Sequence, residues 1–247
     1  RYGYDVMPDG YKIDLEVLYN KVNIFSNLFM FYFIIGLVFL ILLLYQIFNS
    51  NVIVEKIILI VKWFIFLGFL SQTLGLVSRW IISGHAPWSN GYESMIYIAW
   101  ATMLSGVIFS RRSYMTLAAT SIVASLLLMV AHSNWLDPEI TNLVPVLNSY
   151  WLMIHVAIIT ASYGFLALSA ILGLFSLWLI IFTTQNKKKR ISDILSELTL
   201  INERSITIGL FMLTIGTFLG GVWANESWGR YWGWDPKETW ALVSVLV

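Results

Sequence analysis

Residues 24–48 have the sequence IFSNLFMFYFIIGLVFLILLLYQIF, an apolar run without a charged residue. The hydrocarbon core of a bilayer is about 30 Å thick, so a helix needs roughly 20 apolar residues to cross it. Five further stretches meet this requirement, and another begins at residue 238; the five lie at 57–82, 92–110, 115–131, 151–183 and 206–223. The sequence therefore predicts an all-α fold, a polytopic transmembrane helix bundle with six complete spans and a truncated seventh.

The composition of the chain agrees with a membrane protein. Hydrophobic residues make up 58% of it and charged residues 12%, and its mean hydropathy is strongly positive, which lies outside the usual range of soluble domains. The chain has no cysteine, which excludes a disulfide framework, a zinc-thiolate site and thiol redox chemistry of its own. A bound metal must therefore rest on His, Met or carboxylate side chains.

The basic residues predict which connections face the cytoplasm, because Lys and Arg near helix ends stay preferentially on that side. The turn at 49–56, the pair Arg111 and Arg112, and the polar stretch 184–205 with its basic run 187–190 fall on alternate connections. We therefore expect a multi-pass protein whose remaining connections lie together on the outer side of the membrane. The segments left on the outer side contain the unusual Trp, His and Pro residues; they are 1–23, 84–91, 132–150 and 224–237.

The segment 223–240, WANESWGRYWGWDPKETW, holds five tryptophans and one tyrosine. An interfacial aromatic belt is the common explanation, because Trp and Tyr favour the headgroup level of both membrane surfaces. Belt residues, however, usually lie one or two per helix end, whereas Trp228 to Trp234 fall in an expected loop between helices. Exposing so many aromatic side chains of one loop to water is unfavourable unless a flat, apolar molecule covers them. A porphyrin is such a molecule.

Two capping signals predict where helices start. Asp235 at the N-cap, proline after it and Glu238 at the third helical position form a capping box. Satisfying free N–H groups is the ordinary role of both carboxylates, but a helix N-terminus also suits an anionic propionate nearby. Arg230 is placed to add a direct ion pair. The second signal, from Asn90 to Glu93, predicts the start of the third helix.

The three histidines are the candidate metal ligands. His155 lies one turn after Trp151, at the outer end of the fifth expected helix. A hydrogen-bonded interfacial side chain is the usual interpretation, but an ionisable group in a membrane helix is a functional hypothesis by default, and neutral imidazole is the standard axial ligand of haem iron. His85 and His132 occupy outer loop positions, where a solvated histidine needs no explanation. Arg79, close to the outer surface, is expected to extend its charge into solvent.

These residues carry a family resemblance. The stretch from Trp228 to Trp240 resembles the tryptophan-rich WWD signature of haem-handling proteins in cytochrome c biogenesis. The segments GHAPWSNGYES, residues 84–94, and SYWLMIHV, residues 149–156, further resemble the CcsA branch, the System II cytochrome c synthase. In several bacteria CcsA is fused behind CcsB, and a chain that begins with Arg1 rather than Met fits such a fusion.

The resemblance covers the whole chain as most of a CcsA-like half. It implies that residues 1–23 are an extracytoplasmic lead-in that follows a missing N-terminal part. Residues 24–247 then form the transmembrane haem-handling domain, with the WWD loop at 223–240. The implied partners are an N-terminally fused CcsB-like half, membrane lipid and an apocytochrome c, and no nucleic acid.

In that family the WWD loop cradles haem, flanked by two external histidines that act as axial ligands. The resemblance implies that His155 is the first ligand of haem b iron and that the second lies beyond Val247, while His85 receives no iron-binding role. The implied activity is that of a cytochrome c haem lyase, which joins haem vinyl groups to the cysteines of an apocytochrome Cys-x-x-Cys-His motif. The remaining haem-binding residues implied are Trp223, Trp228, Arg230, Trp232, Trp234, Asp235 and Trp240.

Other classes of function stay open. A haem-delivery module similar to CcmC would pass haem to a chaperone without forming bonds; the His85 segment favours the synthase branch. A channel or transporter would place ionisable residues through the midplane, whereas the expected helix interiors are nearly free of charge apart from Lys62 near one inner end. A haem-free subunit with an aromatic belt is the structural alternative, and purified protein without a Soret band would support it.

Overall fold

The computed structural model describes residues 10–133, 135–140, 149–181 and 188–246, and within these ranges it is helical without any strand. The expected all-α fold is therefore confirmed. Residues 1–9 of the expected lead-in, 141–148 of an expected outer loop and 182–187 next to the basic run lie outside the described residues. The helices are α1 (Gly10–Val22), α2 (Ile24–Phe48), α3 (Val52–Ser83), α4 (Gly91–Phe109), α5 (Tyr114–His132), α6 (Tyr150–Ile181), α7 (Lys188–Trp228) and α8 (Pro236–Leu246).

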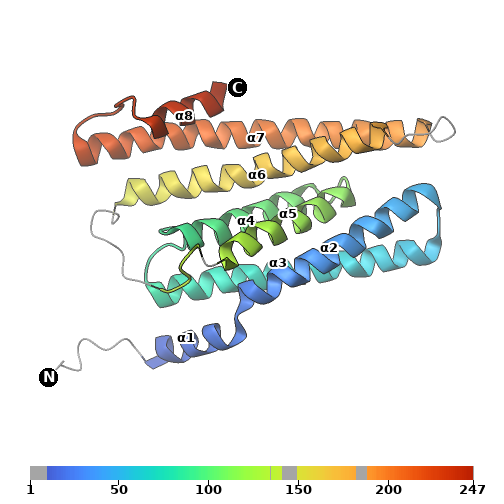
Figure 1. The fold of residues 1–247 in the computed structure, drawn as a ribbon, viewed down its shortest axis with the longest axis horizontal. Helices are drawn as coiled ribbons and strands as arrows, with labels where there is room; N and C mark the ends of the chain where they lie inside the picture. Colours follow the sequence, from blue (N-terminus) through green and yellow to red (C-terminus); the bar gives the residue numbers. More distant parts are fainter. Residues whose placement is uncertain (1–9, 134, 141–148, 182–187, 247) are drawn as a thin grey trace.

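The long helices run side by side in an elongated bundle (Figure 1). Helices α2 and α3 form one antiparallel pair, α6 and α7 form another, and the shorter α4 and α5 lie between the two pairs. Helix α8 folds back along α7, and α1 lies beside the C-terminal end of α3, below the bundle in this view. Helices α4, α6 and α8 begin at the end where α7 finishes, which we call the tryptophan-rich end. The described parts of the predicted outer segments therefore gather at one end.

Most of the expected spans correspond to long helices. Five stretches of the described chain are long and apolar enough to cross a membrane; they are Gly10–Ile47, Gly91–Phe109, Tyr114–His132, Tyr150–Ile181 and Ile191–Trp228. The expected span at 57–82 forms α3, a continuous helix of 32 residues that carries Lys62 and Arg79 and is not one of those five. The expected seventh span begins as α8, which is described for 11 residues. The polytopic helix bundle is thus confirmed, with a span count one below the prediction.

The polar stretch 184–205, expected as a cytoplasmic connection, belongs largely to helix α7. This helix has 41 residues, which at about 1.5 Å per residue is roughly twice the thickness of a bilayer core. Its first half is amphipathic: Leu198 and Ile201 are fully buried, while Glu203 and Arg204 are exposed. The loop prediction was wrong because the polar residues here form one face of a helix whose other face is apolar.

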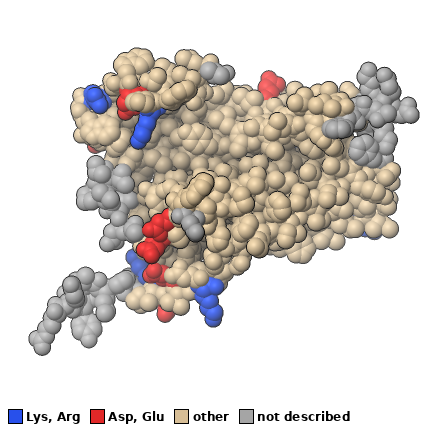
Figure 2. All heavy atoms as spheres, in the orientation of Figure 1, with Lys and Arg blue, Asp and Glu red and all other residues tan. Residues whose placement is uncertain are grey.

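The flank of the bundle is apolar. In the face that Figure 2 shows, charged side chains are nearly absent along the middle and gather mostly at the tryptophan-rich end. Large hydrophobic side chains on α2 and α3, such as Ile34, Ile41, Phe64 and Leu74, are exposed. An uncharged belt around helices whose backbone bonds are all internal is what a bilayer requires. The chain is a multi-pass membrane protein.

Candidate functional site

The tryptophans of segment 223–240 lie on three elements rather than on one loop. Trp223 and Trp228 belong to the last turns of α7. The residue after the helix is Gly229, which has a φ of 71° and whose N–H donates to the carbonyl oxygen of Asn225 at 2.9 Å. Glycine is the usual residue at this left-handed position after a helix. The expected WWD loop at 223–240 is therefore a shorter connection between two helices.

Tyr231 holds this connection against α7. Its hydroxyl donates to the carbonyl oxygen of Phe218 at 2.9 Å. Its ring covers Gly221, where a Cβ would lie only 2.7 Å from ring atoms. Trp234 adopts a positive φ of 57°, which costs a residue with a side chain about 1–2 kcal/mol. The connection is thus folded back along the end of α7 and strained at one tryptophan.

Asp235 and Glu238 start helix α8 as predicted, with one difference. Oδ1 of Asp235 accepts the N–H of Glu238 at 2.8 Å, and the helix begins at Pro236. Oε2 of Glu238, however, accepts the N–H of Gly233 at 2.6 Å instead of the N–H of the capping residue. The carboxylate pair therefore fixes both the helix start and the backbone between the tryptophans.

Three tryptophans of the segment are exposed. The exposed fractions are 56% for Trp228 and 69% for both Trp234 and Trp240. Trp228 meets Trp223 edge to face at a centroid distance of 4.8 Å, and Trp234 meets Trp232 in the same manner at 5.8 Å. Each pair therefore combines a half-buried indole with an outer indole that is open to a ligand.

The two half-buried indoles carry unpaired donors. Among the described residues, three buried side-chain atoms lack a hydrogen-bond partner: Nε1 of Trp223, Nε1 of Trp232 and Nε2 of Gln72. An unpaired buried N–H costs about 1–3 kcal/mol, and buried indoles normally find a partner. Both donors lie within one short segment, next to the exposed indoles.

His155 lies in the second turn of α6 and faces α7. Its Nδ1 is 2.7 Å from the carbonyl oxygen of Gly216. Gly220 makes room for the ring, since a Cβ there would lie 2.5 Å from the ring's Cε1. Because a carbonyl oxygen only accepts, Nδ1 of the neutral ring carries the hydrogen and Nε2 keeps its lone pair. This is the tautomer that binds a metal through Nε2.

The other predicted residues have local partners. The guanidinium of Arg230 lies against Gly233, where a Cβ would be 3.0 Å from its Cζ; Arg230 is exposed and forms no ion pair with any described residue. The ring of His132 stacks on Phe29 at 6.0 Å. Nδ1 of His85 lies 3.2 Å from the next carbonyl oxygen and 3.2 Å from a serine hydroxyl.

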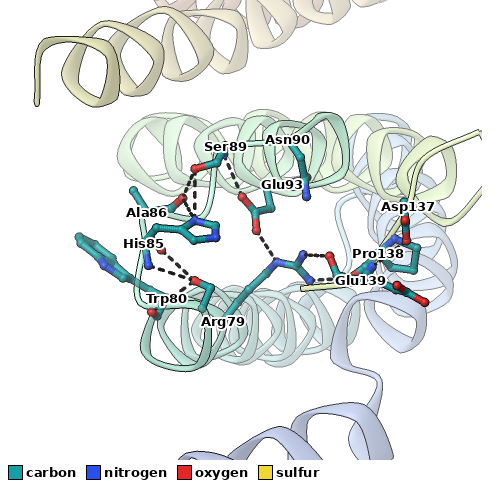
Figure 3. A network of polar contacts seen from close by, with 11 residues as sticks. Arg79, Trp80, His85, Ala86, Ser89, Asn90, Glu93, Asp137, Pro138 and Glu139 are labelled. Atoms are coloured by element: carbon teal, nitrogen blue, oxygen red, sulfur yellow. Dashed lines mark hydrogen bonds and ion pairs between the residues drawn. The ribbon is translucent and has the colours of Figure 1, made fainter. Parts of the chain in front are cut away.

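Sequence reasoning missed a buried ion pair at the same end of the bundle. Arg79 and Glu93 are each 1% exposed, and Nε of the arginine lies 2.9 Å from Oε1 of the glutamate (Figure 3). The other guanidinium nitrogens donate to the carbonyl oxygens of Pro138 at 2.9 Å and Glu139 at 3.1 Å. The expectation that Arg79 extends into solvent was wrong, because partners inside the protein use its donors. Opposite charges at the facing ends of consecutive spans were the available signal.

Known proteins resemble this chain in sequence. The family model described as "Cytochrome C assembly protein" matches residues 88–247. The chain belongs to this family. It is 44% identical to protein NrfI of Wolinella succinogenes over 245 residues, which are 99% of the chain and 27% of NrfI. It is 35% identical to CcsA of Guillardia theta, with 73% of the chain and 67% of that protein covered.

A further relative shows that the likeness is not confined to the matched family region. CcsA of Prochlorococcus marinus subsp. pastoris is 34% identical over 258 residues, which cover 93% of this chain and 79% of that protein. The chain spans about a quarter of NrfI but two thirds or more of these CcsA proteins. It is thus a CcsA-like cytochrome c biogenesis protein.

In this CcsA-like protein the structure brings only part of the predicted site together. The tryptophans form the two edge-to-face pairs described above. The rings of His155 and Tyr231 pack against two neighbouring glycines of α7, Gly220 and Gly221. His155 and the connection after α7 therefore pack against the same turn of α7. Within the described residues, His155 makes no ring contact with any of the five tryptophans of segment 223–240.

Proposed function

We propose that this CcsA-like protein holds haem b at its tryptophan-rich end, outside the bacterial inner membrane, for covalent attachment to apocytochromes c. The observation that carries the proposal is the state of His155, whose Nδ1 is bonded to the carbonyl of Gly216 at 2.7 Å. This bond leaves Nε2 as the free base, and a neutral imidazole is the standard axial ligand of haem iron. A carbonyl on the other ring nitrogen also fixes the ring and raises its basicity.

The aromatic surface supports a flat apolar ligand rather than a bare metal ion. Trp228, Trp234 and Trp240 are the exposed indoles of the segment. Burying these faces under a ligand is favourable by about 25 cal/mol of free energy for each Å² of apolar area removed from water. Aromatic faces also favour stacking. The chain thus offers two features that fit haem: one imidazole nitrogen for the iron and several exposed indole faces for the ring.

Positive charge near the indoles suits the two propionates of haem. Arg230 is exposed and has no anionic partner among the described residues. The N-terminus of α8 lies a few residues further along, and helix N-termini attract anions through their free N–H groups and dipole. Asp235 uses its carboxylate to cap that helix, so we assign it the role of shaping this corner of the site.

The proposed reaction is that of a cytochrome c haem lyase. Each cysteine thiol of a Cys-x-x-Cys-His segment adds across one vinyl group: sulfur bonds to one vinyl carbon, the thiol hydrogen goes to the other, and no atom leaves. When bound, haem supplies both vinyl groups and the iron that the apocytochrome histidine finally ligates. The contribution of this chain is positioning, because holding the reactants in a defined geometry removes a large entropic part of the barrier.

Residues outside this chain complete the proposed assembly. The chain accounts for 27% of NrfI, so the activity of a whole protein of that kind involves further segments. We propose a second axial histidine beyond Val247 and a CcsB-like half fused N-terminally, with lipid around the bundle and an apocytochrome c as the protein substrate.

The proposal is tested on the full-length protein purified in detergent. We expect a Soret band that His155→Ala weakens or shifts, and a loss of holocytochrome synthesis that added imidazole partly restores by filling the empty ligand position. His132→Ala is the matched control, because its ring stacks on Phe29 at 6.0 Å and has no assigned role. Full synthesis and an unchanged spectrum in His155→Ala would remove His155 from the site. Haem transfer to an acceptor without thioether product would identify a delivery module similar to CcmC instead.

A further inference from the structure

One indole ties the connection between α3 and α4, residues 84–90, to helix α6. Nε1 of Trp88 donates to the carbonyl oxygen of Met153 at 3.1 Å. Met153 lies two residues before His155, whose ring is bonded to Gly216 on α7 at 2.7 Å. Two different elements therefore hold the same turn of α6, one through its backbone and the other through the proposed ligand itself.

The connection that carries Trp88 is itself bonded in place. The backbone N–H of Trp88 donates to the carbonyl oxygen of Ala86 at 2.9 Å, and the hydroxyl of Ser89 donates to the same oxygen at 2.9 Å. The N–H of Ser89 donates to Oε2 of Glu93 at 2.8 Å, while Oδ1 of Asn90 accepts the N–H of Glu93 at 2.7 Å. The bond to α6 therefore starts from a fixed backbone.

Ring contacts fix the direction of the indole. The Trp88 ring lies 4.8 Å from the ring of Tyr97 and 5.9 Å from that of Trp80, measured between centroids. These neighbours come from α4 and α3. The N–H of Trp88 therefore points at the first turns of α6 without depending on α6 for its orientation.

The buried ion pair anchors this arrangement. Glu93 accepts from Ser89 with one oxygen and from Arg79 with the other, at 2.9 Å (Figure 3). Both charges are 1% exposed, so neither can exchange its partner for water, and removing either one would leave an uncompensated buried charge. The contacts run from Arg79 through Glu93 and Ser89 to Trp88 and then to α6.

From this series of contacts we infer that Trp88 is a positioning residue for His155, with the Arg79 and Glu93 pair as its anchor. The inference rests on the proposed haem-ligating role of His155. Helix ends fray, and His155 lies only two turns into α6. A ligand must be held within about 0.5 Å of its productive place to bind well, so a second restraint on this turn acts directly on the proposed iron site.

The test compares Trp88→Phe with Trp100→Phe in the full-length protein. Either change keeps an aromatic ring and deletes one indole N–H; the bond of Trp100 runs to Oγ1 of Thr73 at 2.9 Å and joins α3 to α4. In haem-free protein we expect amide hydrogen exchange over residues 154–157 to become about fivefold faster in Trp88→Phe, the size expected for one lost hydrogen bond, and unchanged in Trp100→Phe. In haem-loaded protein we expect Trp88→Phe to shift the Soret band toward its position in His155→Ala, and added imidazole to reverse the shift.

Unchanged exchange over 154–157 in Trp88→Phe, or an equal rise in Trp100→Phe, overturns the inference. Faster exchange with an unshifted Soret band, in a protein whose band does respond to His155→Ala, also overturns it, because the indole then supports α6 without placing the ligand. An unchanged band in His155→Ala overturns the proposed function itself, and the positioning role falls with it, whatever the exchange shows.

Discussion

The Nδ1 atom of His155 lies 2.7 Å from the carbonyl oxygen of Gly216, across the contact between α6 and α7. One turn along α7, Gly220 leaves just enough space for the imidazole ring. The proposed ligand is therefore placed by two positions on a neighbouring helix, and this relationship makes the site sensitive to changes that touch neither histidine nor tryptophan.

Gly220→Ala is expected to displace the imidazole ring, because the new Cβ would lie 2.5 Å from Cε1 of His155. Haem retention should fall to the level of His155→Ala, which absorption at the Soret band measures. Gly173→Ala on α6 is the control: its Cβ would meet its nearest neighbour, Nδ2 of Asn202, at an ordinary 3.9 Å. Equal retention in both variants would contradict this account of the pocket.

Trp234→Ala is expected to lower haem retention while leaving the temperature of thermal unfolding nearly unchanged. The side chain is 69% exposed, and alanine at this positive φ is no more strained than tryptophan. Trp135→Ala serves as the matched control, because Trp135 is 89% exposed at the same end of the bundle but lies outside segment 223–240. Haem titration in detergent compares the two variants. If removing Trp135 weakened haem binding as much, general aromatic contact rather than this segment would be responsible.

Asp235→Ala should destabilise the start of α8, because it removes the acceptor for the N–H of Glu238 at 2.8 Å. Loss of an N-cap costs about 0.5–2 kcal/mol, and asparagine caps about as well as aspartate. Amide exchange across residues 237–240 should therefore rise in Asp235→Ala and stay near the wild-type rate in Asp235→Asn. A comparable rise in the asparagine variant would show that charge, not capping, fixes the helix start.

Glu93→Ala is expected to be the most destabilising of these changes. It leaves the guanidinium of Arg79, which is 1% exposed, without its ionic partner and frees the N–H of Ser89. Removing one member of a buried pair costs about 3–5 kcal/mol, and unfolding in detergent and denaturant measures it. Glu226→Ala, at an exposed position on α7, should change stability by less than about 0.5 kcal/mol. Similar midpoints for the two variants would refute the structural role of the pair.

The orientation in the membrane is tested with single cysteines introduced into this part of the protein, which has none of its own. Asn186→Cys adjoins the basic run and lies outside the described residues, and Ser227→Cys is exposed in the last turn of α7. A membrane-impermeant thiol reagent applied from the periplasmic side should label Ser227→Cys alone, because basic connections stay in the cytoplasm. Labelling of both from one side would disprove the proposed topology.

Particular elements show how far the sequence alone predicts this protein. The apolar runs identify α2, α5 and α6 to within a few residues, since length and hydropathy are local properties that a bilayer imposes directly. The cap at Asp235 was also predictable, because its partner Glu238 lies three residues away. The prediction of a loop at 184–205 was wrong. Its charges are visible in the sequence, but Leu198 and Ile201 form a buried face only because another helix packs against them.

The amino-acid sequence by itself determined an all-helical membrane protein, the start of α8 and the presence of a tryptophan-rich segment, because each follows from residues close together in the chain. Only the tertiary structure decided that Gly216 fixes the ring of His155, that Arg79 is buried with Glu93, and that Trp88 reaches α6. These contacts join residues 14 to 65 positions apart. Nothing in a local pattern says which helices become neighbours, so the orientation of the proposed ligand had to come from packing.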